Sequence, residues 1–232
     1  VATAIAFGGP GAVFWMWTIA FIGSASAFIE STLAQIYKVK QDGQYRGGPA
    51  YYIEKGMGVK WFAYLFAFAA LIAMAILMPG VQSQSIATAM DNAFNISPWI
   101  TGGVVVVLLA FIIFGGVKRI ATAAQFIVPF MALAYILVSL VIVLINITEV
   151  PAVISLIVKS AFAIDSAFGG IVGMAIAWGV KRGIYSNEAG QGTGAHPAAA
   201  AEVSHPAKQG LVQAASVYID TLLVCSATAF MI

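Results

Sequence analysis

Charged residues are scarce in this sequence. Lys, Arg, Asp and Glu make up 9% of its 232 residues, whereas soluble domains carry about 25%. Hydrophobic residues make up 61%, and the mean hydropathy is +0.96. Because so few charged side chains cannot cover a water-soluble fold of this length, the composition predicts an integral membrane protein embedded in a lipid bilayer. The net charge of +2 indicates no particular partner, and we expect no nucleic-acid binding.

Cysteine and histidine are also rare, which argues against several kinds of site. The one cysteine, Cys225, lies in an apolar run, and neither His196 nor His205 has a second ligand at metal-binding spacing. The segment GQGTG at 190–194 lacks the lysine of a phosphate-binding loop, and no nucleophile elbow is present. We therefore expect no cofactor, no metal site built from cysteine and histidine, and no enzymatic activity.

Long apolar runs fill the sequence instead. A membrane-spanning helix needs roughly 20 mainly apolar residues. These runs are long and unbroken rather than short and alternating, which predicts an all-α fold with residues 1–232 in a single transmembrane domain. Pro79-Gly80 predicts a kink or tilt in the second run. The six predicted spans are 12–36, 61–89, 99–116, 124–146, 161–180 and 210–232.

The two ends of the chain lie close to apolar runs. The chain begins with Val1 rather than Met and stops within a run, so we expect an internal fragment of a longer protein. Residues 1–11 are too few to cross a bilayer, and the GGPG at 8–11 is a strong helix stop. Residues 1–11 are therefore predicted to be the outer end of a helix, with a loop or a re-entrant piece as the alternative.

Lysine and arginine are concentrated in alternate connections between the predicted spans. Ten of the 11 lie in 38–60, 117–123 and 181–209, and the remaining one is Lys159. Positively charged loops stay in the cytoplasm. The pattern therefore predicts a multi-pass protein of the plasma membrane with these three connections inside.

Ionisable side chains within the apolar runs are candidates for function because a charge in a bilayer is costly. Glu30 and Asp220 lie well inside predicted spans. They are predicted either to coordinate an ion or relay a proton, or to form structural hydrogen bonds or ion pairs, with Arg182 as one candidate partner of Glu30. Asp165 lies close to Lys159 and is expected at the membrane interface.

Two further stretches suggest a polar site within the spans. Gln82 and Gln84 follow Pro79-Gly80, and their amides need partners from a neighbouring helix or from a polar solute. The stretch 168–171, FGGI, combines an aromatic side chain with glycines. Glycines in a membrane helix favour either close helix packing, here along Gly169, Gly173 and Ala177, or a broken helix whose free backbone groups bind a substrate.

Five segments together resemble one transporter family, the alanine or glycine:cation symporters. They are GGPGAVFWMW at 8–17, GGPAYYIEKGMG at 47–58, GGVKRIA at 115–121, GVKRGIYSNEAGQGTGAHPAA at 179–199 and QGLVQAASVYIDTLLVC at 209–225. The resemblance implies a secondary active symporter of the bacterial or archaeal inner membrane. It would carry alanine or glycine into the cell with sodium. A channel or a structural membrane subunit is the alternative.

The resemblance also implies a fold and site residues. The fold would be a leucine-transporter-like inverted-repeat bundle, of which this chain holds the end of helix 1 and helices 2 to 7. Helix 6 of such folds is discontinuous, and most of the sodium site would lie in helices outside this chain. The family usually has asparagine where this chain has Gln84, which puts the role of that residue in doubt. The substrate-site candidates are Thr3, Gln82, Gln84, Phe168, Gly169, Gly170 and Ile171.

The polar stretch 181–196, KRGIYSNEAGQGTGAH, would be the inner end of helix 6 and the cytoplasmic link to helix 7. Its glycines, Gly190 and Gly192, are predicted to act as a hinge as the bundle changes conformation. The oligomeric state and the preferred amino acid are left open by the sequence.

Overall fold

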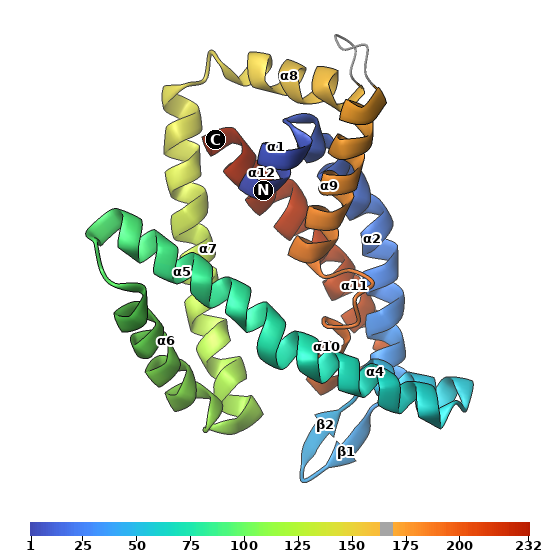
Figure 1. The fold of residues 1–232 in the computed structure, drawn as a ribbon. Coiled ribbons are helices and arrows are strands. Elements are labelled where there is room, and N and C mark those ends of the chain that lie inside the picture. The colour runs from blue at the N-terminus through green and yellow to red at the C-terminus, as the bar shows by residue number, and fades with distance from the viewer. Residues whose placement is uncertain (163–168) are drawn as a thin grey trace. The chain divides into compact units, whose positions relative to one another are not determined.

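The computed structural model describes residues 1–162 and 169–232, and most of them are helical (Figure 1). The chain forms two compact units: Val1–Tyr64 with Tyr135–Ile232, and Leu65–Ala134. Phe168 and Asp165, two residues singled out from the sequence, lie outside the described residues.

The first unit contains α1 (Ala2–Gly8), α2 (Gly11–Ile36), β1 (Val39–Gln41), β2 (Gln44–Arg46), α3 (Pro49–Tyr52), the π-helical turn η1 (Ile53–Met57), α8 (Val150–Phe162), α9 (Gly169–Asn187), α10 (Ala195–Ala200), α11 (Pro206–Tyr218), the π-helical turn η3 (Ile219–Cys225) and α12 (Ser226–Met231). The second contains the π-helical turn η2 (Ala73–Leu77), α5 (Met78–Phe94) and α6 (Pro98–Ile113). Two helices cross the unit boundaries, α4 (Lys60–Ile72) and α7 (Gly116–Ile145).

Within the residues that the structure describes, four continuous helical stretches are long and apolar enough to cross a membrane, namely Gly11–Ile36, Lys60–Phe94, Gly116–Ile145 and Pro206–Met231. Pro98–Ile113 and Val150–Phe162 are shorter apolar helices. The expected run 161–180 covers the end of α8 and most of α9, with residues outside the described ranges between them. The prediction of an all-helical membrane protein is confirmed.

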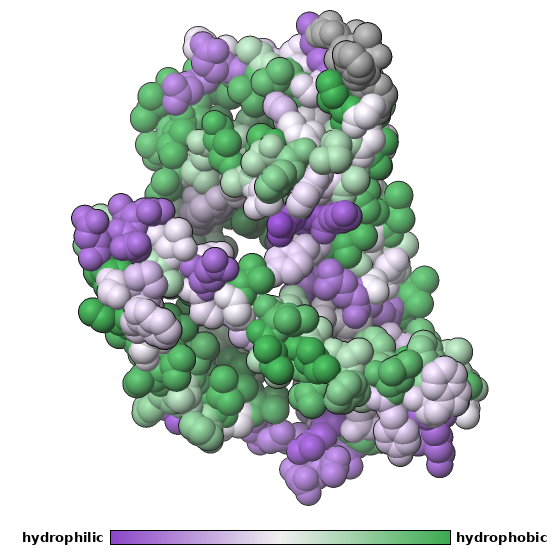
Figure 2. Space-filling model, in the orientation of Figure 1, coloured by the Kyte–Doolittle hydropathy of each residue, from purple (hydrophilic) through white to green (hydrophobic). Residues whose placement is uncertain are grey.

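Apolar side chains cover much of the visible surface (Figure 2). In the second unit the side chains of Phe111, Phe126 and Phe130 are 69%, 76% and 78% exposed. Water would not tolerate so much apolar surface, because burying it is the main favourable term in folding. The exposed faces are therefore suited to hydrocarbon.

The chain turns sharply between α1 and α2, as the sequence predicts. Helix α1 ends at Gly8, Gly9 has φ 71°, and α2 begins at Gly11 after Pro10. A positive φ is strained for residues with a Cβ, so glycine fits this turn. The helical interpretation of residues 1–11 is confirmed over the loop alternative.

A kink or tilt was expected at Pro79-Gly80, and the helix departs from regular α-helical geometry just before these two residues. The π-helical turn η2 precedes α5, and Pro79 lies in the first turn of α5. Proline has no N–H to donate, and a π-helical turn shifts the local hydrogen-bond register to absorb the break.

The strands β1 and β2 form a short antiparallel hairpin that was not expected. Asp42 and Gly43, at its tip, both have positive φ, 52° and 73°. Asp-Gly between two β-prone stretches is a strong hairpin signal, and the sequence VKQDGQYR contained it. The hairpin extends the polar connection after α2.

Helix α2 is the centre of the first unit, and it lies alongside α9 and α11 (Figure 1). Glycines make this close approach possible. A Cβ at Gly179 would lie 2.5 Å from the Ala12 carbonyl oxygen, and one at Gly210 would meet Phe28 and Thr32. Small residues let membrane helices approach until their backbones touch.

The glycines of α9 that contact α2 lie in the second half of the helix, at Gly179 and Gly183. Nothing in the described part of the chain lies within 4 Å of a Cβ at Gly173. The packing face along Gly169, Gly173 and Ala177 stays a prediction.

Substituting Gly179 with alanine should destabilise the full-length protein by about 1–3 kcal/mol, because the new Cβ meets a backbone oxygen that cannot move aside. The matched control is Gly173→Ala, where the space is open and alanine is favoured in a helix by about 1 kcal/mol. Thermal unfolding of the purified protein in detergent measures both. Equal unfolding midpoints for the two variants would contradict this account of the α2–α9 contact.

Candidate functional site

Glu30 is a buried carboxylate in α2, with 8% of its surface exposed. Its two oxygens accept hydrogen bonds from backbone amides: the Gly190 N–H lies 3.2 Å from Oε1 and the Gly192 N–H lies 3.0 Å from Oε2. Both donors belong to the polar link that follows α9. The carboxylate therefore clamps this link, 188–194, onto α2.

The local conformation of the link explains why its amides point at Glu30. Glu188, Gly190 and Gly192 all have positive φ, at 55°, 80° and 79°. A backbone that alternates between left- and right-handed conformations turns successive N–H groups toward one point and forms an anion-binding nest. Two of the three positions are glycine, for which this conformation carries no steric cost.

Side chains fix the start of the link. Asn187 Oδ1 accepts a hydrogen bond from the Ala189 N–H at 3.0 Å, and Gln191 Nε2 donates to the Ile184 carbonyl at 3.0 Å. An asparagine that bonds the backbone two residues ahead stabilises a turn at a helix end. The link is therefore an ordered loop rather than a simple spacer.

Arg182 does not pair with Glu30 in the structure. Its guanidinium lies 5.6 Å from the centre of the Trp178 ring and 5.8 Å from that of Tyr185. The two backbone amides already satisfy the Glu30 carboxylate, and they do so without burying a second charge. The backbone clamp takes the place of the ion pair with Arg182 considered from the sequence, and the functional role of Glu30 stays a prediction.

The loop around the clamp is held from two sides. His196 Nδ1 lies 3.0 Å from the Gly192 carbonyl oxygen, and the imidazole ring packs against Gly48, whose φ is 124°. Burial raises the pKa of Tyr52 to about 12, with a further contribution from the Glu30 charge. The Tyr52 phenol therefore stays protonated and neutral beside the clamp.

The C-terminal end of α2 is tied to the segment after α10. The Gln35 amide donates to the carbonyls of Ala198 and Ala201, the latter at 2.8 Å. The Lys38 ammonium donates to Gln35 Oε1 at 2.6 Å and to the Ala201 carbonyl at 2.9 Å. Desolvation lowers the pKa of Lys38, and the charge of Glu202 opposes this effect. The connections after α2 and after α9 thus form one joined polar surface.

Asp220 lies at the centre of a second polar cluster, on the π-helical turn η3. Ser186 Oγ donates to Asp220 Oδ2 at 2.7 Å, and Thr221 Oγ1 donates to the same oxygen at 3.2 Å. Asn187 Nδ2 donates to Thr221 Oγ1 at 3.1 Å. The cluster joins the end of α9 to the middle of the last long helical stretch.

The substrate-site candidates fall in both units. Thr3 in α1 and Gly170 and Ile171 at the start of α9 belong to the first unit, and Gly169 is the first residue of α9. Gln82 and Gln84, in α5, belong to the second unit, and both side chains are exposed. Their assignment to a substrate site stays a prediction.

Three members of the Asp220 cluster were not singled out as site residues from the sequence: Ser186, Asn187 and Thr221. They do occur in the SNEAG and IDT stretches that carried the family resemblance. Hydrophobicity patterns could not find them, because only the fold brings residues 34 positions apart into contact.

The sequence pattern of the sodium:alanine symporter family matches residues 1–232. The chain belongs to this family. It is 82% identical over 232 residues to YrbD of Bacillus subtilis (strain 168), covering 100% of this chain and 48% of the relative. It is 55% identical over 231 residues to the sodium/proton-dependent alanine carrier protein of Bacillus sp. (strain PS3), covering 100% of this chain and 52% of that protein.

A third relative is the amino-acid carrier protein AlsT of Bacillus subtilis (strain 168), 50% identical over 232 residues, which are 100% of this chain and 50% of that protein. The chain therefore spans about half the length of the relatives it matches. The resemblance found from the sequence motifs is confirmed at the level of the family.

Replacing Glu30 with glutamine should loosen the link in the full-length protein. A carboxamide can accept a hydrogen bond through one atom only, so one of the two amides loses its acceptor. Hydrogen bonds to charged groups contribute about 1.5–3 kcal/mol. We expect the amides of Gly190 and Gly192 to exchange with deuterium about 10- to 100-fold faster.

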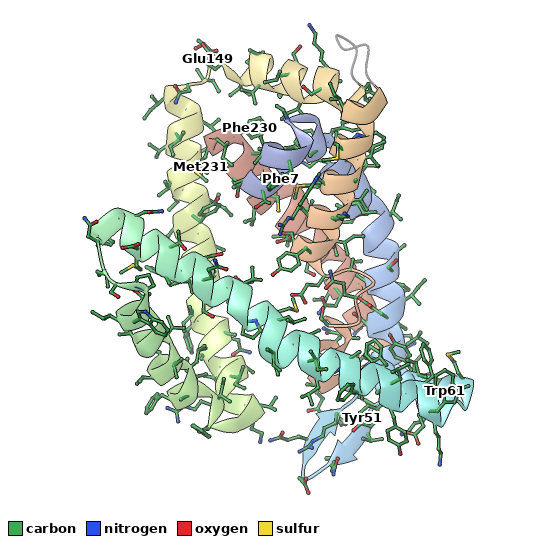
Figure 3. All side chains as sticks on the ribbon, in the orientation of Figure 1. Phe7, Tyr51, Trp61, Glu149, Phe230 and Met231 are labelled. Carbon is green, nitrogen blue, oxygen red and sulfur yellow. The ribbon has the colours of Figure 1, made fainter. Side chains whose placement is uncertain are left out.

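The control for this experiment is Glu149→Gln. Glu149 is exposed in the connection between α7 and α8 (Figure 3). Mass spectrometry of the peptide spanning 186–194 reports the exchange rate in both variants. An unchanged rate in the Glu30 variant would show that the carboxylate does not hold the link.

Proposed function

We propose that the protein containing this chain is a secondary active symporter that moves a small neutral amino acid, alanine or glycine, into the cell together with sodium. The observation that carries the proposal is the match of the family along all 232 residues. The printed names of two relatives support it, one an alanine carrier dependent on sodium or protons and the other an amino-acid carrier. A transporter rather than an enzyme fits these names.

We propose a leucine-transporter-like arrangement for the full-length bundle. In this arrangement α1 is the end of helix 1, α2 is helix 2, the stretch Lys60–Phe94 is helix 3, and α9 belongs to helix 6. Folds of this kind bind substrate at interrupted helices near the bilayer midplane. The start of α9 at Gly169, beside Gly170 and Ile171, is the part of this chain proposed to meet the substrate, with Thr3, Phe168, Gln82 and Gln84 as further candidates.

The proposed orientation places the connections 38–60, 117–123 and 181–209 in the cytoplasm. Contacts within the first unit support a shared side for two of them. Gly48 packs on His196, and the Lys38 ammonium binds the Ala201 carbonyl. Segments that touch through polar groups in this way belong on one face of a bilayer, because hydrocarbon cannot satisfy such groups.

A channel and a structural subunit are the competing functions. A channel would need a polar stripe that continues through several helices. The buried polar contacts of Glu30 and of Asp220 are instead local, and each carboxylate has its own partners. Local clusters of this kind suit an occluded site better than an open pore.

Alanine uptake by the full-length protein in proteoliposomes tests the proposal. An inward sodium gradient should drive accumulation of labelled alanine above equilibrium, and dissipating the gradient should abolish it. Glycine should compete. Alanine accumulation that does not depend on the sodium gradient would indicate a different coupling ion. Alanine flux without accumulation would favour a channel.

The hinge proposed at Gly190 and Gly192 gives a second test. Alanine in a left-handed conformation costs roughly 1–2 kcal/mol, so Gly190→Ala and Gly192→Ala should destabilise the clamped conformation of the link and disturb the conformational change that transport requires. Uptake should fall more than equilibrium alanine binding. The control in the same loop is Gly194→Ala, where φ is −61° and a Cβ would make only an ordinary contact. Uptake at the control level in both variants would exclude the hinge.

A further inference from the structure

Glu30 and Asp220, two carboxylates carried by long helical stretches, are stabilised in different ways. Glu30 has two backbone N–H donors aimed at its two oxygens. Asp220 has the hydroxyls of Ser186 and Thr221 and, at 4.0 Å, the Cys225 thiol, and all three donate to the same oxygen, Oδ2. Backbone amides can only donate, whereas a hydroxyl carries lone pairs and can turn to act as an acceptor.

This difference matters because Asp220 has no ion-pair partner within residues 1–162 and 169–232. An ionised carboxylate in a membrane-spanning segment is expensive unless another charge or several donors compensate it. Two hydroxyls and a weakly donating thiol that share one oxygen compensate only part of the charge. A bound cation would supply the rest.

The surroundings of Asp220 contain the oxygen atoms that such a cation requires. Hard cations bind carboxylate, hydroxyl and carbonyl oxygens. Ser186 Oγ and Thr221 Oγ1 lie 2.7 Å and 3.2 Å from Asp220 Oδ2, so three oxygens from two separate helical elements converge. Thr221 is fully buried, with 0% of its surface exposed, and its hydroxyl is oriented by Asn187.

The backbone of η3 adds a second, independent feature. Residues Ile219–Cys225 are π-helical. A π-helical turn interrupts the regular hydrogen-bond ladder, and such turns occur frequently at functional sites. Irregular backbone within a membrane helix is tolerated where it lines a cavity, and its carbonyl oxygens can bind sodium.

We propose that Asp220, Ser186 and Thr221 form part of a Na⁺ site at the contact of α9 with η3, and that Asn187 positions the Thr221 hydroxyl. This inference rests on the proposed symport function and names residues for its coupling ion. The carboxylate supplies the negative charge, and the hydroxyls turn their lone pairs toward the ion when it binds. Glu30 is not a ligand of this site, because its oxygens already bind the link.

Sodium-dependent thermal stabilisation of the purified full-length protein tests this site without relying on transport. The unfolding midpoint is measured while NaCl replaces choline chloride at constant ionic strength. Sodium should raise the midpoint of the wild-type protein, because a ligand that binds only the folded state stabilises it. In Asp220→Asn the half-maximal sodium concentration should rise at least about tenfold, which corresponds to about 1.4 kcal/mol.

Two conservative variants keep the test meaningful if Asp220→Asn does not fold. Ser186→Ala and Thr221→Val each remove one oxygen and leave the carboxylate, so each should raise the half-maximal sodium concentration about three- to tenfold. Glu149→Gln is the matched carboxylate control because its side chain is exposed in a connection. It should respond to sodium as the wild-type protein does.

The outcomes separate this inference from the proposed function. A wild-type sodium response that Asp220→Asn and Ser186→Ala leave unchanged would overturn the site while leaving symport intact. If sodium does not change the unfolding midpoint of the wild-type protein and alanine uptake does not depend on sodium, the sodium symport function is wrong, and the proposed site is wrong with it. Loss of the response in the cluster variants alone supports the site.

Discussion

Hydrocarbon offers no hydrogen-bond partners, so every polar group that this chain carries into the membrane must find its partner within the protein. In the first unit many of these partners meet around one helix, although the buried Ser31 hydroxyl on that helix has no hydrogen-bond partner among the described residues. Helix α2 approaches α9 and α11 through glycines, and it carries Glu30 to the point where the link after α9 folds back. The close packing of the helices and the hydrogen bonding of the buried carboxylate therefore both depend on α2, because the glycine contacts bring the link within reach of Glu30.

The polar link that stands out in the sequence is explained by this arrangement. Its glycines do not merely make it flexible. Two of them adopt the left-handed conformation that points their amides at Glu30, and Asn187 and Gln191 hold the turn that precedes them. The link is therefore an ordered loop held by the Glu30 carboxylate and by its own side chains.

Local chemistry made part of the structure predictable. The helix stop at 8–11 depends on neighbouring residues only, and long apolar runs indicate membrane helices whatever their partners are. The hairpin at 39–46 had a local signal in Asp42-Gly43 that was overlooked. The partners of Glu30 could not be predicted, because its amide donors lie 160 and 162 positions away and are backbone groups that carry no signal of their own. The Ser186 contact with Asp220 likewise exists only once α9 and η3 are side by side.

The connections after α2 and after α9 form one joined polar surface, and we propose that this surface lies on the cytoplasmic side of the membrane. Labelling of single introduced cysteines with a membrane-impermeant reagent tests it most directly, at Gly43 in the hairpin, at Glu202 after α10 and at Glu149 between α7 and α8. The account predicts that positions 43 and 202 react only after the cells are permeabilised, whereas position 149 reacts in intact cells. Reaction of 43 and 202 from opposite faces of the membrane would contradict it.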